Sequence, residues 1–319
     1  MFPLNIAHRG GAGLWPENTL AAFRNAAVHG ADGAELDVQL SRDGELIVFH
    51  DYRLKPEICR GEDGKWITKP TPRIKDLSLA ELRAFDIGRT DPASAYARAH
   101  PLVAPSDGER IPTLEEVIGV VKGAPKPFKL FVELKTSFSD RAQSADPIAL
   151  ADATLKVLRE HDYLQHCILV GFDWPGLLHA KTRAPECECW FTTLDSRWFG
   201  TNEAPPQSDP PSPAALEVLR HWEKMGISPW AGGYDAVKYG GSIRKAIHAA
   251  GGDGWFPTTT DITDETLAEA RALGLKVGAW TVDDPDEMKR LIALGIDAIC
   301  TNRPDMLEKM LCANGDEKP

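Results

Sequence analysis

The sequence predicts an α/β protein built as a (β/α)8 barrel, with a small subdomain inserted after the second strand. Short apolar runs alternate with amphipathic segments along nearly all of the 319 residues, and one long polar stretch interrupts the alternation. Repeated strand–helix pairs indicate parallel βαβ units, and eight such units close a barrel. An open doubly wound sheet is the alternative architecture.

The expected strands are short apolar runs bounded by turn-forming residues. In chain order they are 4–8, 33–39, 45–49, 128–134, 167–172, 188–193, 254–257, 275–281 and 296–301. If the run at 45–49 is a hairpin extension of the second strand, eight main strands remain, which is the number in a barrel.

The expected helices alternate with these strands. They are 18–29, 78–85, 113–122, 147–160, 175–184, 212–225, 242–250, 263–273, 284–294 and 304–311. Thr113 and Glu116 have the spacing of a capping box at a helix start. Asp284 followed by Pro285 is an N-cap with proline at the first helical position, and Gly295 follows the end of that helix.

Two stretches break the alternation. Residues 51–110 are rich in turn formers and charge and are too long for a plain barrel connection, so we interpret them as the inserted subdomain. Residues 195–212 hold paired prolines with polar spacers, which predicts an extended or mobile loop. Neither stretch has the features of a domain boundary, so residues 1–319 are expected to form a single domain.

Composition limits the possible partners. Lysine and arginine total 36 against 47 aspartates and glutamates, a net charge of −11, which argues against a nucleic-acid-binding surface. A small anionic substrate stays possible, because a site can be locally positive. No apolar stretch is long enough for a transmembrane segment and no signal peptide is visible, so a cytoplasmic location is expected. Nothing in the sequence indicates the oligomeric state.

Acidic residues inside apolar strands are the most informative feature. Glu35 and Asp37 alternate with apolar residues in 33–39, and Glu133 does so in 128–134. If the apolar set faces the outer helices, the acids face the barrel interior. Carboxylates there repel one another and lose hydration, so they need a cation or a proton. Three such acids form an all-oxygen ligand set that suits Mg²⁺, Ca²⁺ or Mn²⁺ better than zinc.

The three acids could instead have no metal-binding role. They could lie at strand ends in contact with water, or form ion pairs with Arg9 and Lys135. For one acid alone that reading is preferred, but Glu35 and Asp37 together on an otherwise apolar strand favour a metal.

Two histidines stand at predicted strand ends. His8 ends the first strand and precedes Arg9, and His50 ends the run at 45–49. The carboxyl ends of barrel strands carry the chemistry in barrel enzymes. Two histidines beside an acid cluster favour acid–base catalysis, and Arg9 can offer a planar, bidentate fork to a phosphate.

Several short motifs follow one another in order. They are His8-Arg9-Gly10, Pro16-Glu17-Asn18-Thr19, Gly33-Ala34-Glu35-Leu36-Asp37-Val38, Asp43-Gly44, His50-Asp51, Ile111-Pro112-Thr113-Leu114-Glu115-Glu116, Val132-Glu133-Leu134-Lys135, Trp280-Thr281-Val282, Gly295-Ile296-Asp297 and Thr301-Asn302-Arg303-Pro304-Asp305. Together they resemble the glycerophosphodiester phosphodiesterase family from the first strand to the last.

The resemblance implies a TIM-type barrel with a subdomain inserted where 51–110 stands. It also implies one divalent cation, Mg²⁺ or Ca²⁺ with Mn²⁺ as a further option, held by Glu35, Asp37 and Glu133. The reaction it implies is hydrolysis of a small glycerophosphodiester to glycerol 3-phosphate and an alcohol.

The resemblance further implies roles for five side chains. His8 and His50 would be the acid–base pair. Arg9 would contact the phosphate, Lys135 would be a further phosphate or metal-shell contact, and Trp280 would line the pocket. Which histidine is the acid, and whether water or the glycerol 2-hydroxyl attacks, stay open.

This chain departs from the family in two places. The family commonly has an acidic residue where Asn302 stands, and we assign no role to that side chain. After Arg53-Leu54, the usual threonines are replaced by Lys55-Pro56-Glu57. The rim that selects the alcohol is therefore expected to differ.

Two alternative functions follow from the same residues. A lysophospholipase D or a phospholipase C-like lipid phosphodiesterase would need an exposed aromatic rim, and Trp15, Trp66, Trp198 and Phe199 lie in predicted loops. A non-catalytic barrel that binds phosphodiesters is the other alternative. The presence of all three acids, both histidines and the arginine argues against it.

Overall fold

Within the described residues, eight parallel strands close into a barrel and a ninth strand extends it. The structure is a computed structural model that describes residues 2–69, 71–200 and 213–315. The strands are β1 Leu4–Ala7, β2 Gly33–Leu40, β3 Leu46–Val48, β4 Lys129–Leu134, β5 Cys167–Gly171, β6 Glu188–Thr192, β7 Gly254–Phe256, β8 Lys276–Ala279 and β9 Ala298–Thr301.

Strand pairing shows how the barrel closes. The order is β1-β9-β8-β7-β6-β5-β4-β2-β3, and a further parallel pairing joins β1 to β2. This last pairing closes the ring, so the predicted barrel is confirmed and the open sheet is wrong. β3 runs antiparallel to β2, as expected for a hairpin extension.

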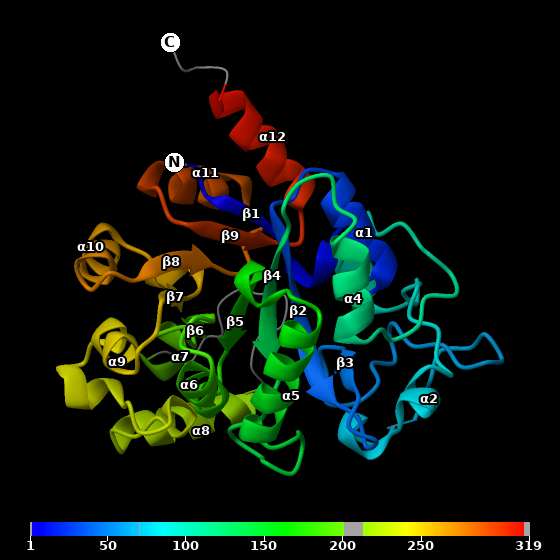
Figure 1. The fold of residues 1–319 in the computed structure, drawn as a ribbon, viewed down its shortest axis with the longest axis horizontal. Helices are drawn as coiled ribbons and strands as arrows, with labels where there is room; N and C mark the ends of the chain where they lie inside the picture. Colours follow the sequence, from blue (N-terminus) through cyan, green and yellow to red (C-terminus); the bar gives the residue numbers. More distant parts are fainter. Residues whose placement is uncertain (1, 70, 201–212, 316–319) are drawn as a thin grey trace.

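The helices lie around the outside of the strands (Figure 1). They are α1 Leu20–Val28, α2 Leu79–Leu82, α3 Ala95–Ala99, α4 Leu114–Val121, α5 Pro147–Glu160, α6 Trp174–Arg183, α7 Arg197–Gly200, α8 Pro213–Lys224, α9 Ile243–Ala249, α10 Asp264–Ala272, α11 Pro285–Leu294 and α12 Pro304–Gly315. Short 3-10 turns include η1 His8–Gly10, directly after β1.

The predicted helix starts are confirmed in detail. Thr113 and Glu116 form the reciprocal capping box of α4. Asp284 caps α11 by accepting bonds from two backbone N–H groups, and Gly295 ends that helix in the left-handed conformation. Capping thus fixes where these two helices meet the barrel ends.

Three helix predictions need correction. The helix expected at 78–85 is only the four residues of α2, and α3 was not expected. The loop expected at 195–212 contains the short helix α7 at its start, while residues 201–212 lie outside the described part of the chain.

Side chains of the barrel strands alternate between two clusters of buried residues. Leu36 and Val132 belong to the cluster between the strands and the helices. Phe131, Trp190 and Phe256 belong to a second cluster in the lumen, where Phe131 meets Trp190 edge-on at 5.2 Å between ring centroids. The acids of β2 and β4 share the lumen side, as the alternation predicts.

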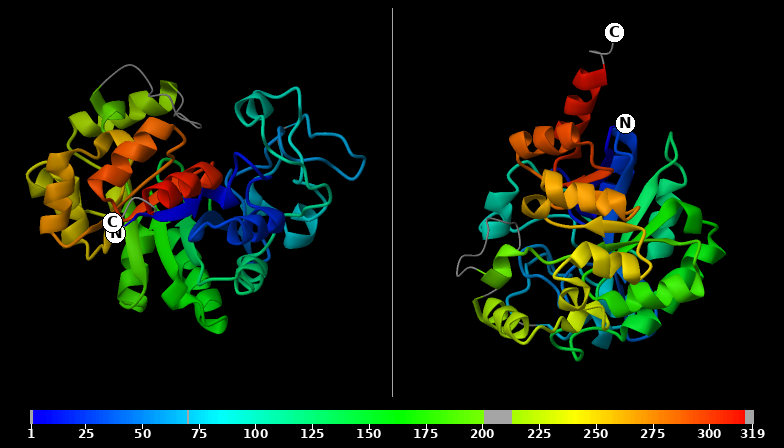
Figure 2. Two further views of the ribbon diagram at one scale, coloured as in Figure 1. Left: turned by 90° about the horizontal axis from the view of Figure 1, so that it is seen from above. Right: turned by 90° about the vertical axis from the view of Figure 1, so that its left-hand side faces the viewer.

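β3 and the residues after it pack around an apolar cluster of their own. Its buried members are Ile47, Phe49, Leu54, Ile58, Cys59, Ile74, Leu82, Ile87 and Ile111. In the left-hand view of Figure 2 this cyan segment extends from the barrel beside the blue N-terminal elements. The inserted subdomain over 51–110 stays a prediction, which the separate cluster supports.

No helix among the described residues combines the length and apolar character needed to cross a membrane.

Candidate active site

A pocket of about 310 Å³ opens at the carboxyl ends of the barrel strands. It is lined by all but one of the predicted site residues, namely His8, Arg9, Glu35, His50, Glu133, Lys135 and Trp280. The remaining residue, Asp37, is 1% exposed and lies beside them. The structure thus brings together residues that are up to 272 positions apart in the chain (280 minus 8).

The three predicted metal ligands converge. β2 and β4 pair in parallel with Asp37 opposite Glu133, and Glu35 lies two residues earlier on the same face of β2. One carboxylate oxygen from each acid lies within 4.8 Å of the others. An all-oxygen set of this size fits a hard divalent cation.

The electrostatics of the cluster support the same fit. Burial, together with the carboxylates of Asp37 and Glu133, raises the pKa of Glu35 well above its ordinary value. Glu35 therefore binds a proton more readily than an ordinary glutamate when no divalent cation is bound. A divalent cation between the oxygens would remove the repulsion that causes this shift.

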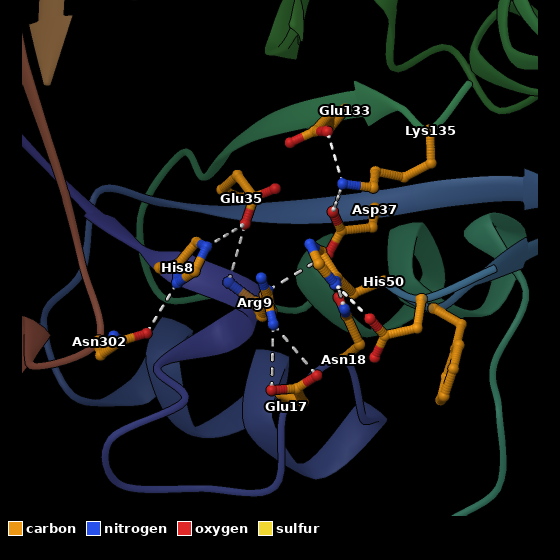
Figure 3. A network of polar contacts seen from close by, with 12 residues as sticks. His8, Arg9, Glu17, Asn18, Glu35, Asp37, His50, Glu133, Lys135 and Asn302 are labelled. Carbon is orange, nitrogen blue, oxygen red and sulfur yellow. Dashed lines mark hydrogen bonds and ion pairs between the residues drawn. The ribbon is translucent and has the colours of Figure 1, made fainter. Parts of the chain in front are cut away.

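Lys135 supplies a positive charge next to the acids. Its Nζ lies 2.9 Å from Glu133 Oε1 and 3.6 Å from Asp37 Oδ1. Burial alone would lower the pKa of Lys135, but the two carboxylates outweigh it and raise that pKa. Lys135 is therefore charged and lies directly beside the candidate cation site (Figure 3).

Asp37 is held in the ionised form. Burial alone would raise its pKa, but electrostatic interactions with His50, Lys135 and Arg9 lower that pKa well below the usual range. Asn18 Nδ2 also donates to Asp37 Oδ2 at 2.9 Å.

Arg9 is buried and held from two sides. Its backbone N–H donates to Glu35 Oε2 at 3.0 Å, which its positive φ of 50° allows. Its guanidinium Nη1 donates to both oxygens of Glu17 at 3.3 Å, and its Nε lies 3.6 Å from Asp37 Oδ2. Glu17 in turn accepts a hydrogen bond from the Tyr96 hydroxyl in α3. These contacts thus fix the orientation of the Arg9 guanidinium at the pocket.

His8 faces the acid cluster with one ring nitrogen and Asn302 with the other. Nε2 lies 3.8 Å from Glu35 Oε2, and Nδ1 lies 2.7 Å from Asn302 Oδ1. Burial and the charge of Arg9 lower the pKa of His8 to about 4.

His50 approaches from the other side of Arg9 in the view of Figure 3. Its Nδ1 lies 3.2 Å from Asp51 Oδ1. Gln39, the third inward polar residue of β2, donates through Nε2 to the carbonyls of Phe49 and Asp51 at 2.7 and 2.9 Å. The inward face of β2 therefore also fixes the backbone on both sides of His50.

Apolar side chains also line the pocket. Trp280 donates through Nε1 to the Phe256 carbonyl at 2.9 Å and meets Phe172 edge-on at 5.1 Å. Phe138, Leu194 and Trp198 are further apolar residues of the lining. The charged part of the pocket thus suits a divalent cation and an anionic group such as a phosphate. The apolar part suits the carbon atoms of a ligand.

Several site residues were missed by sequence reasoning. Asn302 had no assigned role, yet it is the partner of His8, and Asp283 holds it in turn. Tyr96 lies in a helix too short to predict, and Tyr52 lines the pocket directly after His50-Asp51. Its position directly after His50-Asp51 is the sequence feature that could have indicated Tyr52 as a pocket residue.

The aromatic rim expected for a lipid enzyme is not formed by the described residues. Trp198 lies in α7 and is 3% exposed, and Trp15 stacks on His29 at 5.6 Å. Trp66 is half-buried, and the Phe199 side chain lies outside the described part of the structure.

The model of the glycerophosphoryl diester phosphodiesterase family matches residues 8–306. The chain belongs to this family. The match includes every predicted site residue, so the resemblance seen in the motifs is confirmed. As a member of the family, the chain is a phosphoric diester hydrolase.

Similar proteins agree with this membership. A glycerophosphodiester phosphodiesterase of Caldanaerobacter subterraneus subsp. tengcongensis is 27% identical over 315 residues, which cover 99% of this chain and 100% of that protein. A crystal structure from Silicibacter pomeroyi, named within the same family, is 28% identical with a TM-score of 0.78 and covers 97% of this chain and 93% of its own.

A third comparison concerns a product complex. A phosphodiesterase of Oleispira antarctica, solved with the product sn-glycerol-3-phosphate, is 24% identical and has a TM-score of 0.66. The alignment covers 98% of this chain and 97% of that one. At 24% identity, this similarity supports only the fold of the present protein.

Proposed function

We propose that the protein hydrolyses glycerophosphodiesters to glycerol 3-phosphate and an alcohol, using one divalent cation and the histidine pair His8 and His50. One observation carries the proposal. The three acids converge within 4.8 Å in a pocket that also holds both histidines, an arginine and a lysine.

Glu35, Asp37 and Glu133 would hold the cation. When bound, a divalent cation supplies Lewis-acid stabilisation for the charge on the phosphoryl oxygens. The charges of Lys135 and Arg9 act on the same oxygens, since both line the pocket. The relative's product, sn-glycerol-3-phosphate, has the phosphate and the carbon chain that the charged and apolar parts of this pocket would receive.

The histidines perform the proton transfers. Each has its Nδ1 engaged, by Asn302 in His8 and by Asp51 in His50, which leaves Nε2 of each ring for the substrate. One histidine takes the proton of the nucleophile, and the other gives a proton to the departing alkoxide. The apolar wall around Trp280 contacts the carbon atoms of the substrate.

The first test removes each histidine. We expect His8→Ala and His50→Ala to lower kcat for glycerophosphocholine by about 10²–10⁴-fold each, because a positioned acid or base contributes that much. His248→Ala, which changes an exposed histidine of α9, is the matched control. Released glycerol 3-phosphate is measured enzymatically, and circular dichroism checks the fold. Near-wild-type turnover in either site variant would reject the assignment.

The second test concerns the cation. EDTA treatment is expected to abolish turnover, and Mg²⁺, Ca²⁺ or Mn²⁺ is expected to restore it. Comparing glycerophosphocholine with vesicles of lysophosphatidylcholine distinguishes the proposed substrate class from lipid substrates. Bound glycerophosphodiester without hydrolysis under any of the three cations would indicate the non-catalytic barrel instead.

A further inference from the structure

The Nδ1 atom of His8 is the first member of a chain of hydrogen bonds that leads from the pocket to Asp283 at the surface. It lies 2.7 Å from Oδ1 of Asn302, which follows β9. Nδ2 of Asn302 donates to Oδ2 of Asp283 at 2.7 Å. Asn302 is 3% exposed, whereas Asp283 is exposed to solvent. An amide therefore stands between the histidine and a carboxylate.

Asp283 determines which way the Asn302 amide points. Its carboxylate accepts the Nδ2 bond on one oxygen, while the other oxygen accepts from the Asn302 backbone N–H at 2.8 Å and from Thr301 Oγ1 at 2.9 Å. An ionised carboxylate only accepts hydrogen bonds, so it must face the NH₂ side of the amide. The amide oxygen is then left to face His8.

This orientation fixes the proton on the histidine. Since the amide oxygen of Asn302 can only accept, Nδ1 of His8 must be the donor. In the neutral ring the lone pair is then on Nε2, the atom 3.8 Å from Glu35 Oε2 and beside the candidate cation site. The opposite amide orientation would place NH₂ against Nδ1 and move the proton to Nε2.

We propose that Asn302 is a positioning residue that, under the control of Asp283, holds His8 in the Nδ1–H tautomer with Nε2 directed at the substrate. The inference rests on the proposed role of His8 in hydrolysis. An amide performs this task without adding a charge beside His8, because the negative charge is on Asp283, one hydrogen bond further away.

The first experiment reads the tautomer without requiring any turnover. Long-range ¹H–¹⁵N correlation spectra of protein labelled at histidine nitrogens distinguish Nδ1–H from Nε2–H rings, and the His8→Gln spectrum identifies the His8 signals. We expect a single Nδ1–H form in the wild type. In Asn302→Leu, which keeps the volume but removes the amide, we expect a mixture of tautomers. An Nε2–H form in the wild type, or an unchanged spectrum in the variant, would overturn the proposal.

The second experiment exchanges the two polar partners. Asn302→Asp alone places two carboxylates in contact and is expected to lower kcat by about 10–100-fold, the usual effect of losing a supporting partner. KM should change by less than about 3-fold, because Asn302 does not contact the phosphate in this proposal. In the double variant Asp283→Asn with Asn302→Asp, the amide at position 283 donates to the carboxylate at position 302, so each polar group keeps a partner although this one hydrogen bond is reversed. The double variant is expected to recover most of the loss.

The two experiments separate this proposal from the proposed function. If the wild type hydrolyses no glycerophosphodiester with any of the three cations, the proposed function fails, and the spectra still decide the tautomer. If the wild type is active but the exchanged pair recovers no activity while remaining folded, the positioning role is rejected and the proposed function stands.

Discussion

At the scale of single residues, Glu35 lies among like charges in the proposed cation site. Its raised pKa follows from burial next to Asp37 and Glu133. Perturbed pKa values of this kind cluster at functional sites. Removing the charge should therefore have opposite effects on folding and on cation binding.

We expect Glu35→Gln to abolish the rise in melting temperature that Mn²⁺ or Ca²⁺ produces in the wild type, because ligands that bind the native state stabilise it. In EDTA the variant should melt at or above the wild-type temperature, since one repelling carboxylate is gone. Differential scanning fluorimetry measures both effects. Glu62→Gln, at an exposed position of the insertion, should leave both unchanged. A normal Mn²⁺ shift in Glu35→Gln would exclude Glu35 as a ligand.

Sequence reasoning succeeded for residues whose position depends on local geometry. The period of two along β2 and β4 places Glu35, Asp37 and Glu133 inward without any tertiary information. It failed for Asn302, whose contact with His8 joins positions 294 residues apart and exists only in the closed barrel. Motif order located the neighbourhood of Asn302 but gave no reason for an amide there.

At the scale of elements, the short helix α3 connects the insertion to the pocket. The Tyr96 hydroxyl donates a hydrogen bond to Glu17, whose carboxylate accepts from the Arg9 guanidinium. The Lys55 ammonium lies 4.4 Å from the centre of the Tyr96 ring. The insertion therefore contributes to the alignment of Arg9 through Glu17.

We expect Tyr96→Phe to raise KM for glycerophosphocholine by about 3–30-fold with a smaller change in kcat. Losing a hydrogen bond to a charged group costs on the order of 1–2 kcal/mol, and the Arg9 guanidinium becomes less well aligned for phosphate. Steady-state kinetics measure the change. Tyr239→Phe, far from the pocket lining, is the control. An unchanged KM would show that Glu17 holds Arg9 without help from α3.

A second connection between elements is formed by Asp195, just after β6. Its carboxylate accepts from Arg197 at the start of α7 and from Thr258 after β7. Burial alone would raise the pKa of Asp195, but these hydrogen bonds and the Arg197 charge lower it. A carboxyl whose pKa is lower in the folded state adds stability above its unfolded pKa of about 3.9.

We expect Asp195→Asn to lower the free energy of unfolding at pH 7 by about 1–3 kcal/mol. The difference from the wild type should shrink as the pH falls below about 4 and through the folded-state pKa, because the wild-type carboxylate is then protonated. Urea denaturation at several pH values measures this. A constant difference across the acid range would show that the charge of Asp195 is not responsible.

Element prediction failed where the segments were short. α3 and α7 have five and four residues, which is too short for a helical period to be visible. The helices that were predicted well, such as α4 and α11, have both an apolar face and a recognisable cap.

At the scale of the whole molecule, Asn5 in β1 joins the parts of the barrel that meet at closure. It is fully buried, its backbone N–H donates to Asp32 Oδ2 at 2.9 Å, and its Nδ2 donates to the Pro304 carbonyl at 2.9 Å. β1 itself pairs with β2 on one side and β9 on the other. One polar side chain in β1 thus ties the first strand to the start of α12.

We expect Asn5→Ala to lower the free energy of unfolding by about 1–3 kcal/mol, because the Pro304 carbonyl loses a buried donor. The urea m-value should stay unchanged if unfolding remains cooperative. Asn25→Ala, on α1, is the matched control and should be neutral or slightly stabilising through helix propensity. Equal stability of Asn5→Ala and the wild type would show that the closure does not depend on this contact.

The pairing of β1 with β9 also has a consequence for how the protein is made. On the ribosome, His8 emerges early, but Asn302 emerges 294 residues later, and β1 has no β9 partner until then. Synthesis proceeds at about 5–20 residues per second, so this interval lasts on the order of 15–60 seconds. A nascent chain can therefore bring β2 and β4 together well before His8 has Asn302 as its partner. If His8 acts as proposed, hydrolysis should begin only after β9 has joined the barrel.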